Sequence, residues 1–307
     1  MDTARAIKAR SSVPFIFRAG VWKPRTRPYT YQGAGEEGLK WLTEVKQTLG
    51  ISVATEVATP EHVAAALKAG IDYLWIGARS SANPIVVQSI CSAILDLRFK
   101  IGDLKGLLIK NPVNADAALW IGNIERLEKT GLPVMAVHRG CNHMPCWKMA
   151  HELRTARPDI PLLLDPSHMS GDAAQVPELI CKIEELGLDG AMIEVHCNPA
   201  AALSDNAQQV TPLAISRLLL AKSQEPRANS ELNWLRAEID ELDETLWDTI
   251  AARMDVSRRI GEWKKAHHIT PLQPERYQQI VEKIKDKGDF ALRIWEIIHE
   301  ESLKQQE

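Results

Sequence analysis

Charged side chains and histidines stand at or just beyond the ends of seven short apolar runs in the first two thirds of the sequence. The runs are VPFIF (13–17), ISVATEV (51–57), IDYLWIG (71–77), GLLI (106–109), PVMAV (133–137), PLLL (161–164) and GAMIEV (190–195). The groups include Arg18, Lys23, Arg79, Lys110, His138, Arg139, Asp165, His168, Glu194 and Asp205. One arginine or histidine in such a place is as often a structural group as a ligand contact. Several converging cations are costly to bury without anions, so the set predicts a substrate with phosphate or carboxylate groups.

A second set of donors belongs to the same strand ends and consists of His168, Glu194 and Asp205. One imidazole and two carboxylates combine nitrogen and oxygen donors, which suit a divalent metal such as manganese, iron, cobalt or zinc. The alternative interpretation is an ordinary hydrogen-bonded polar cluster. The metal site is favoured because all three side chains follow strand ends, which meet along one rim of the predicted sheet.

The apolar runs resemble β-strands that are buried on both faces, because each is short and nearly all apolar. Helical patterns over residues 60–70, 83–97 and 174–187 alternate with them, and this order predicts a parallel sheet. In a (β/α) barrel, catalytic residues lie just beyond the C-terminal ends of the strands. Residues 1–220 are therefore predicted to form a (β/α)8-type barrel that lacks its first strand. A doubly wound open sheet is the alternative, disfavoured because no glycine-rich nucleotide loop follows the first run.

The last quarter of the sequence has a different pattern. Residues 221–229 are polar, contain Pro226 and are expected to form a linker. Residues 230–307 contain no strand pattern and are predicted to form a small all-α domain of three helices. The first helix is expected to reach about His267, and the others to follow Pro274 and to begin near Asp289. The apolar stripe of the first helix consists of Leu235, Ile239, Leu242, Leu246 and Ile250.

Two cations lie on this apolar stripe. Arg253 follows Leu235 by eighteen residues, and Lys264 follows Leu246 by the same interval, which is five helical turns. Because a charge on a core face is costly unless it is paired, the two cations predict a grip on a small dianion. Arg236 points about 100° away from Arg253 and is expected to serve a different pocket, for example in a partner chain. Cations that extend to solvent from the end of an apolar face are the alternative.

The first 220 residues resemble a known family. The segments that carry the resemblance are FRAGVWKPRT (17–26), ATEV (54–57), WIGARSSANP (75–84), IKNPVN (109–114), HRG (138–140), LDPSH (164–168) and EVHCNPAAALSDNAQQ (194–209). They are similar to the barrel-only type of 3-deoxy-D-arabino-heptulosonate 7-phosphate synthase, which condenses phosphoenolpyruvate with erythrose 4-phosphate in the shikimate pathway. The resemblance implies that phosphoenolpyruvate is held by Arg18, Lys23, Arg79, Lys110 and Arg139, with Lys23 also placed to transfer a proton. It further implies that Pro24, Arg25 and Thr26 contact erythrose 4-phosphate, and that His168, Glu194 and Asp205 bind the metal that polarises the aldehyde.

The sequence departs from this family in two places. The family begins with a strand that ends in Gly-Pro-Cys-Ser, whose cysteine is a metal ligand, whereas this sequence starts in the helix that follows. Residues 141–150 also replace a longer loop that covers the site. Cys141 or Cys146 as a substitute soft ligand is the alternative to two packed free thiols. These departures predict weak or absent synthase activity.

The helical segment resembles the all-helical chorismate mutase family through residues 235–265, PERY (274–277) and IIHEESLKQQ (297–306). That resemblance implies an intertwined homodimer that converts chorismate to prephenate without a cofactor. Arg236 of one chain and Arg253 of the other would bind the substrate carboxylates. Lys264 and Gln306 would hydrogen-bond the ether oxygen, and Arg276 and Ser302 would complete the pocket. Tyr277 stands where some members have a glutamate that contacts the substrate hydroxyl.

The sequence as a whole thus predicts a bifunctional enzyme of aromatic amino acid biosynthesis. The alternative is a helical module that binds prephenate or chorismate to regulate and dimerise an inactive barrel. The 307 residues are 45% hydrophobic and 25% charged, with a net charge of −3, which argues against a nucleic-acid or membrane-surface partner. No apolar run has the length of a membrane span. The five cysteines form no CxxC pair, and we expect a reducing cytoplasm.

Overall fold

The computed structural model describes the chain except residues 12, 24–28, 103, 143, 221–230 and 307. The described residues form two compact units, Met1–Glu238 and Ile239–Glu307. The predicted linker over residues 221–229 lies outside the described residues. The division between the units falls inside the long helix α11 (Glu231–Ala266).

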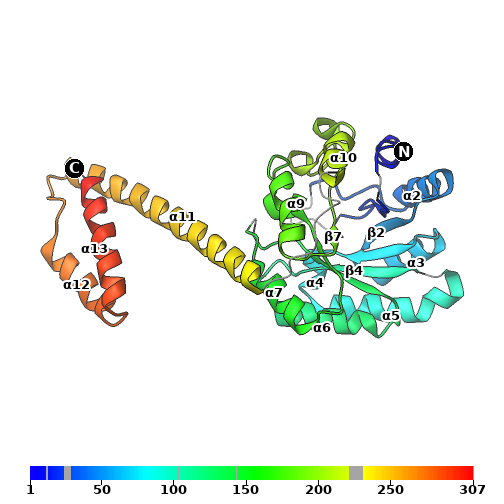
Figure 1. The fold of residues 1–307 in the computed structure, drawn as a ribbon, viewed down its shortest axis with the longest axis horizontal. Helices are drawn as coiled ribbons and strands as arrows, with labels where there is room; N and C mark the ends of the chain where they lie inside the picture. The colour runs from blue at the N-terminus through cyan, green and yellow to red at the C-terminus, as the bar shows by residue number, and fades with distance from the viewer. Residues whose placement is uncertain (12, 24–28, 103, 143, 221–230, 307) are drawn as a thin grey trace. The chain divides into compact units, whose positions relative to one another are not determined.

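The first unit is built on a seven-stranded parallel sheet whose strands follow one another in chain order (Figure 1). The strands are β1 (Phe17–Arg18), β2 (Val53–Val57), β3 (Tyr73–Ile76), β4 (Gly106–Lys110), β5 (Val134–His138), β6 (Leu162–Leu164) and β7 (Gly190–Ala191). Each pairs in parallel with the next, for example Leu74 with Leu107 and Ile109 with Ala136. The arrangement confirms the predicted barrel-type architecture, which is followed by a helical region.

The two edge strands are shorter than the sequence predicts. The run 13–17 contributes only its last residue, since β1 pairs Phe17 with Val53 and Arg18 with Ala54. Pro14 has no amide hydrogen to donate to a ladder, and Val13 is exposed. The run 190–195 likewise contributes only Gly190 and Ala191 to the sheet, and Val195 forms an isolated bridge with Val210.

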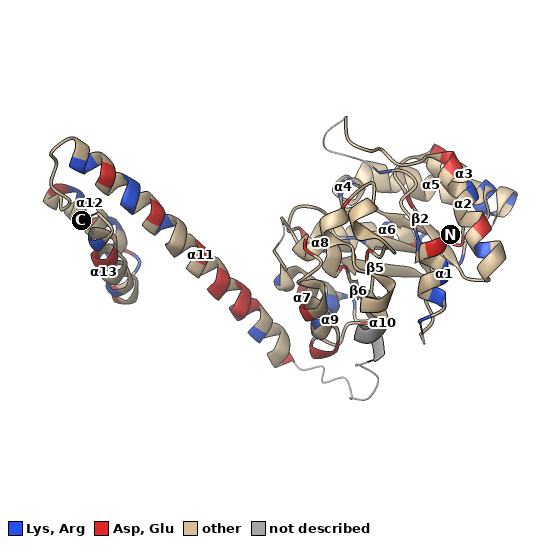
Figure 2. Cartoon of the chain, turned by 90° about the horizontal axis from the view of Figure 1, so that it is seen from above, with Lys and Arg blue, Asp and Glu red and all other residues tan. Residues whose placement is uncertain are grey.

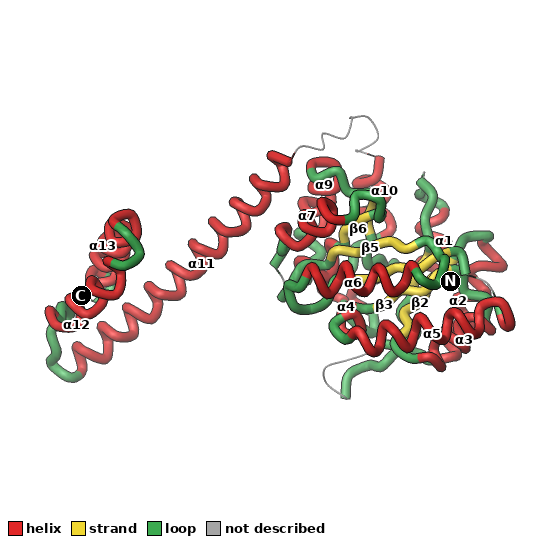
Figure 3. Tube along the Cα trace, turned by 90° about the horizontal axis from the view of Figure 1, so that it is seen from below, coloured by secondary structure: helices red, strands yellow, loops and turns green. Residues whose placement is uncertain are grey.

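Helices surround the sheet of the first unit (Figure 3). They are α1 (Asp2–Lys8), α2 (Glu36–Leu49), α3 (Pro60–Lys68), α4 (Ala78–Ser81), α5 (Pro84–Ile101), α6 (Ala117–Glu128), α7 (Trp147–Ala156), α8 (Pro166–Ser170), α9 (Val176–Glu185) and α10 (Pro212–Leu220). Thr59, Asn83 and Asp116 cap the first turns of α3, α5 and α6 by accepting hydrogen bonds from backbone amides. Local capping therefore fixes where several strand-to-helix loops end.

The strands are buried on both faces, as their composition predicts. Leu74, Leu107 and Ala136 belong to a large cluster shared with helix residues such as Trp120. Alternate strand residues contribute to a second cluster, which contains Ala54, Trp75, Leu108, Val137 and Met192. Because successive side chains of a strand point to opposite faces, these two clusters lie on the two sides of the sheet.

The second unit contains most of α11, together with α12 (Pro274–Lys285) and α13 (Asp289–Lys304). The number of helices agrees with the prediction. Helix α11 ends at Ala266, close to the end predicted near His267. Lys, Arg, Asp and Glu residues are spread along α11 (Figure 2). The stripe predicted to be buried is exposed in the single chain, with Leu242 66% and Leu246 48% accessible. None of the helices in the described ranges has both the length and the apolar character needed to cross a membrane.

Candidate active sites

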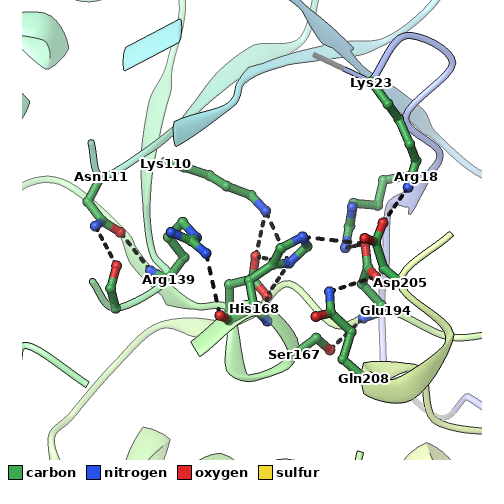
Figure 4. Close-up of polar contacts among 12 residues, drawn as sticks. Arg18, Lys23, Lys110, Asn111, Arg139, Ser167, His168, Glu194, Asp205 and Gln208 are labelled. Carbon is green, nitrogen blue, oxygen red and sulfur yellow. Dashed lines mark hydrogen bonds and ion pairs between the residues drawn. The ribbon is translucent and has the colours of Figure 1, made fainter. Parts of the chain in front are cut away.

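A cavity of about 300 Å³ lies in the first unit beside the C-terminal ends of the strands. It is lined by Arg18, Lys23, Arg79, Lys110, His168, Glu194 and Asp205. The seven come from β1, β4 and the segments that follow β1, β3, β6 and β7, so distant parts of the sequence meet at one rim. Figure 4 shows most of them pointing toward one another. Of the other predicted barrel residues, Pro24, Arg25 and Thr26 lie outside the described residues.

Lys110 is the last residue of β4 and is held by a buried carboxylate. Its Nζ lies 2.5 Å from Asp165 Oδ2 and 3.5 Å from His168 Nδ1. Asp165 also accepts the amide hydrogen of His168 and so caps α8. Burial alone would raise the pKa of Asp165, but the charges of His168 and Lys110 outweigh it and hold this pKa well below its usual range. The charged Asp165 therefore holds two predicted site residues in place, the cation Lys110 and the metal ligand His168.

Glu194 follows β7 and pairs with Arg18. Arg18 Nη2 lies 3.2 Å from Glu194 Oε1, and Gln208 Nε2 donates to Glu194 Oε2 at 3.1 Å. The Arg18 guanidinium also lies over the ring of Trp75, 5.4 Å from its centroid. Burial opposes ionisation of Glu194, but Arg18 and His168 lower its pKa overall. Glu194 is thus an ionised acceptor on the cavity wall.

Lys23 forms the third ion pair of the cavity. Its Nζ donates to Asp205 Oδ2 at 2.8 Å and to Ser204 Oγ at 2.5 Å. Asp205 has a left-handed backbone, with φ of 54°, at the start of a short 3-10 turn. The cation and the carboxylate therefore meet across segments that are 182 residues apart.

Glu56 lines the same cavity and is not among the predicted site residues. Burial raises the pKa of this carboxyl, and the charges of Lys110 and Arg18 offset the rise only in part. A Cβ added at Gly77 would lie 2.0 Å from Glu56 Oε1, so the glycine makes room for the carboxyl. The sequence signal that identifies Glu56 is a charged residue inside a strand, VATEV, whose other residues are uncharged.

Arg139 lies beside the cavity rather than among the residues that line it. Its backbone amide donates to Asn111 Oδ1 at 2.7 Å, and its guanidinium contacts the carbonyl oxygen of His168 at 3.5 Å. Burial lowers the pKa of Arg139. Burial also lowers the pKa of the neighbouring His138 to about 4, and its Nε2 lies 2.6 Å from Pro145 O. His138 is therefore a neutral, structural histidine.

The three predicted metal ligands have suitable donor atoms but are not gathered around one point. His168 Nε2 lies 3.8 Å from Glu194 Oε1, whereas Asp205 is bonded to Lys23. Among the described residues, no group of three or more His, Cys, Asp or Glu side chains could hold one ion. His168 Nε2 and Glu194 Oε1 are the nearest pair of donors. Because Glu194 is paired with Arg18 and Asp205 with Lys23, a metal would have to compete with one cation at each carboxylate.

The second unit brings together four of its predicted residues. Arg253 Nη1 donates to Ser302 Oγ and, at 3.3 Å, to Ile298 O. Lys264 Nζ donates to Pro271 O at 2.5 Å and to Gln306 Oε1 at 2.9 Å. Burial lowers the pKa of both cations. Among the described residues, the hydrogen-bond partners of the two positive charges are neutral, which suits a site for an anion.

Two other predicted residues lie outside this group. Arg276 is exposed on α12. Arg236 is exposed on α11 and belongs to the first compact unit. Neither is placed against Arg253 or Lys264 by a hydrogen bond or ion pair among the described contacts. Among the described contacts, the grip predicted from the helical wheel is therefore built from α11, α13, the loop residue Pro271 and Gln306 just beyond α13.

A strand-end cavity rich in cations on a parallel (β/α) sheet defines a phosphate-handling barrel enzyme class. The model of the DAHP synthetase I family matches residues 1–228, and that of chorismate mutase type II matches residues 235–307. The chain therefore belongs to the DAHP synthetase I family and carries a C-terminal chorismate mutase type II domain.

Individual relatives agree with the barrel assignment. The chain is 29% identical over 203 residues to a phospho-2-dehydro-3-deoxyheptonate aldolase of Thermotoga maritima, covering 64% of this chain and 56% of the relative. It is 28% identical over 265 residues to a 2-dehydro-3-deoxyphosphooctonate aldolase of Variovorax paradoxus, covering 76% of this chain and 88% of that protein. A crystal structure of the Thermotoga maritima DAHP synthase superposes with a TM-score of 0.60 at 24% identity, over 72% of this chain and 62% of that one. The chain thus spans a little over half of the Thermotoga relative, and the structural likeness supports the fold.

Proposed function

We propose that the protein is a bifunctional enzyme of the shikimate pathway. The barrel would condense phosphoenolpyruvate with erythrose 4-phosphate, and the helical domain would convert chorismate to prephenate. The observation that carries the proposal is a cationic site in each matched domain, formed by residues that two separate family resemblances assign to substrate binding. The test is to follow chorismate consumption, and phosphoenolpyruvate consumption that depends on erythrose 4-phosphate, with the purified full chain. A chain that consumes neither substrate contradicts the proposal.

In the barrel, Arg18, Arg79, Lys110 and Arg139 would bind the phosphate and carboxylate of phosphoenolpyruvate. Arg18 and Lys23 already contact carboxylates on the cavity wall, so substrate binding exchanges these anions for those of the substrate. Lys23 would move a proton at the reacting carbon once its bond to Asp205 is released. Asp165 would keep Lys110 oriented during this exchange, because it is buried and ionised.

We further propose that His168, Glu194 and Asp205 hold a divalent metal in the barrel. A bound metal would polarise the aldehyde oxygen of erythrose 4-phosphate. Metal binding to Asp205 would weaken its hold on Lys23, because the two cations would compete for the charge of one carboxylate. Titration of the full chain with Co²⁺, followed by visible absorption, tests this without relying on activity. Unchanged binding in an Asp205→Asn variant would contradict the three-ligand set.

In the helical domain, the reaction needs no nucleophile and no general base. Lys264 and Gln306 would stabilise the negative charge that develops on the ether oxygen as its bond breaks, and Arg253 with Ser302 would hold a carboxylate. The hydrogen bonds of Lys264 to Pro271 O and Gln306 orient the ammonium group before substrate arrives. Such preorganisation selects the compact substrate conformer that reacts.

We also propose a cytoplasmic homodimer through the helical domain. The exposed apolar residues Ile239, Leu242 and Leu246, with Trp247 65% accessible, leave a face of α11 that a second copy would cover. Arg236 of the partner would then complete the carboxylate site. Light scattering should give a molar mass of two chains for the wild type. The Leu246→Glu variant should have the mass of a single chain.

The second candidate function is a regulatory module, in which the helical domain binds prephenate or chorismate without catalysis. It is favoured by Arg253 and Lys264, which have no carboxylate partner among the described residues and would bind an anion whether or not it reacts. Saturable chorismate binding without turnover by the full chain would decide for this alternative.

A further inference from the structure

A histidine that no predicted role uses lies in the helical unit beside the two cations. His299 is on α13, next to Ile298 and three residues before Ser302, both of which contact Arg253. Its ring stacks on Trp295, with centroids 4.9 Å apart and planes inclined by 14°. Tyr277 of α12 packs against it at 5.1 Å. The aromatic rings fix the imidazole at the edge of the cationic group.

The Nε2 atom of His299 is buried and lacks a hydrogen-bond partner among the described residues. A buried nitrogen without a partner is costly, which indicates that something absent from the free chain satisfies it. Burial lowers the pKa of His299, and the charges of Arg253 and Lys264 lower it further. The titratable residue of α12 that packs against His299 is Tyr277. The acidic residues nearest to His299 in the sequence of α13, Glu296 and Glu300, are exposed to solvent. At neutral pH the imidazole of the free protein is therefore neutral, and it lies near two cations.

We infer that His299 contacts the dianion in the helical site through Nε2 and takes up a proton when that ligand binds. The inference rests on the proposed chorismate or prephenate site. Two carboxylates cancel the positive charges of Arg253 and Lys264, so the imidazolium form is no longer repelled. Protonation also turns the contact into a charge-assisted hydrogen bond, which is stronger than a neutral one.

The sign of the pH dependence follows from this proton uptake. The complex holds more protons than the free protein plus ligand, so affinity rises as pH falls through the interval between the two titrations of His299. One linked proton changes affinity by at most about tenfold per pH unit. Above this interval both states contain neutral His299, and affinity becomes independent of this residue's titration.

The experiment is calorimetric titration of the full chain with prephenate in two buffers of different ionisation enthalpy at each pH from 5.5 to 8. We expect buffer-dependent heats that correspond to uptake of up to one proton per site, with tighter binding at lower pH. His299→Gln keeps a hydrogen-bond donor but cannot titrate, so its heats should not depend on the buffer. His299→Leu should bind about tenfold more weakly at low pH. His267→Gln, which alters an exposed histidine of the same domain, is the matched control and should behave as the wild type.

Wild-type binding without proton uptake, or uptake that persists in His299→Gln, overturns the inference and leaves the proposed function intact. Absence of both prephenate binding and chorismate consumption overturns the proposed function and the inference together. Thermal unfolding midpoints of the variants separate a lost contact from a lost fold.

Discussion

Gly261 sets how closely α11 and the C-terminal end of the chain can approach. It lies on α11 one turn before Lys264, and it is buried. A Cβ added there would lie 2.5 Å from Gln306 Cα and 2.9 Å from Gln306 O. Both atoms belong to the backbone, so a side-chain rotation cannot relieve the clash. The change Gly261→Ala therefore moves Gln306 away from Lys264.

The size of this effect follows from the distances. Carbon atoms in contact are about 3.5–4.0 Å apart, so Gln306 must retreat by about 1 Å or more. The Lys264–Gln306 hydrogen bond, now 2.9 Å, would lengthen to nearly 4 Å and be lost. A misplacement of about 1 Å can cost about a hundredfold in rate. Alanine also favours the helix by about 1 kcal/mol over glycine. This gain offsets the lost hydrogen bond, which contributes about 1 kcal/mol, so stability should change little.

Steady-state chorismate consumption by the full chain measures the outcome. We expect kcat to fall about a hundredfold in Gly261→Ala, with a smaller change in KM because the Arg253–Ser302 contact remains. The control is Gly122→Ala in α6, where, among the described residues and apart from the helix's own backbone, the one atom within 4 Å of the new Cβ is Nη1 at the end of the Arg126 side chain, at 3.3 Å. Wild-type kcat in Gly261→Ala would refute the reasoning that Gln306 must be held against Lys264.

Three further predictions concern single residues. Lys264→Ala should lower mutase kcat by about 10³-fold with an unchanged thermal midpoint; near-normal turnover would contradict its role. Asp165→Asn should lower the free energy of unfolding of the barrel by about 3–5 kcal/mol in denaturant titrations, because buried Lys110 loses its anion. Burial opposes protonation of His151, but hydrogen bonds with Glu238 and Glu231 raise its pKa overall. The wild type should therefore exceed His151→Gln by roughly 2–4 °C in thermal midpoint at pH 5.5, and lose this advantage as pH rises through the folded pKa; an advantage that persists at high pH would contradict this ion-pair role.

The central strands were predictable because burial on both faces leaves a simple mark, a short and continuous apolar run. The edge strands were not, since pairing at an edge depends on one neighbour only. Phe17 and Arg18 pair with β2, whereas the preceding segment contains Pro14 and departs from the sheet. The same limit shortens β7 to two residues.

The charged residues of the cavity were predictable because the ends of parallel strands meet at one rim. The residues that contact them could not be predicted from the sequence. Glu56 depends on the space beside Gly77, and the Lys110–Asp165 contact depends on the turn that begins α8. In the helical unit, a wheel of α11 places Arg253 and Lys264 but says nothing of what α13 brings to them. His299 belongs to that second helix, and only the packed structure joins it to the site.

The two sites differ in how their cations are matched. In the barrel, Arg18, Lys23 and Lys110 each contact a carboxylate, so the free cavity is close to neutral. In the described part of the helical unit, Arg253 and Lys264 contact hydroxyl, carbonyl and amide oxygens and no carboxylate, so their two positive charges are not neutralised there.

Unmatched charge attracts a dianion from solution, and salt screens this attraction as the Debye length falls from about 10 Å at 0.1 M toward about 3 Å at 1 M. Chorismate kcat/KM should therefore fall several-fold as KCl rises over this range. Lys304→Gln, which removes an exposed cation already paired with Glu301, should keep the same salt dependence. A kcat/KM that is indifferent to salt would mean that a carboxylate, such as one from a second copy, already neutralises the site.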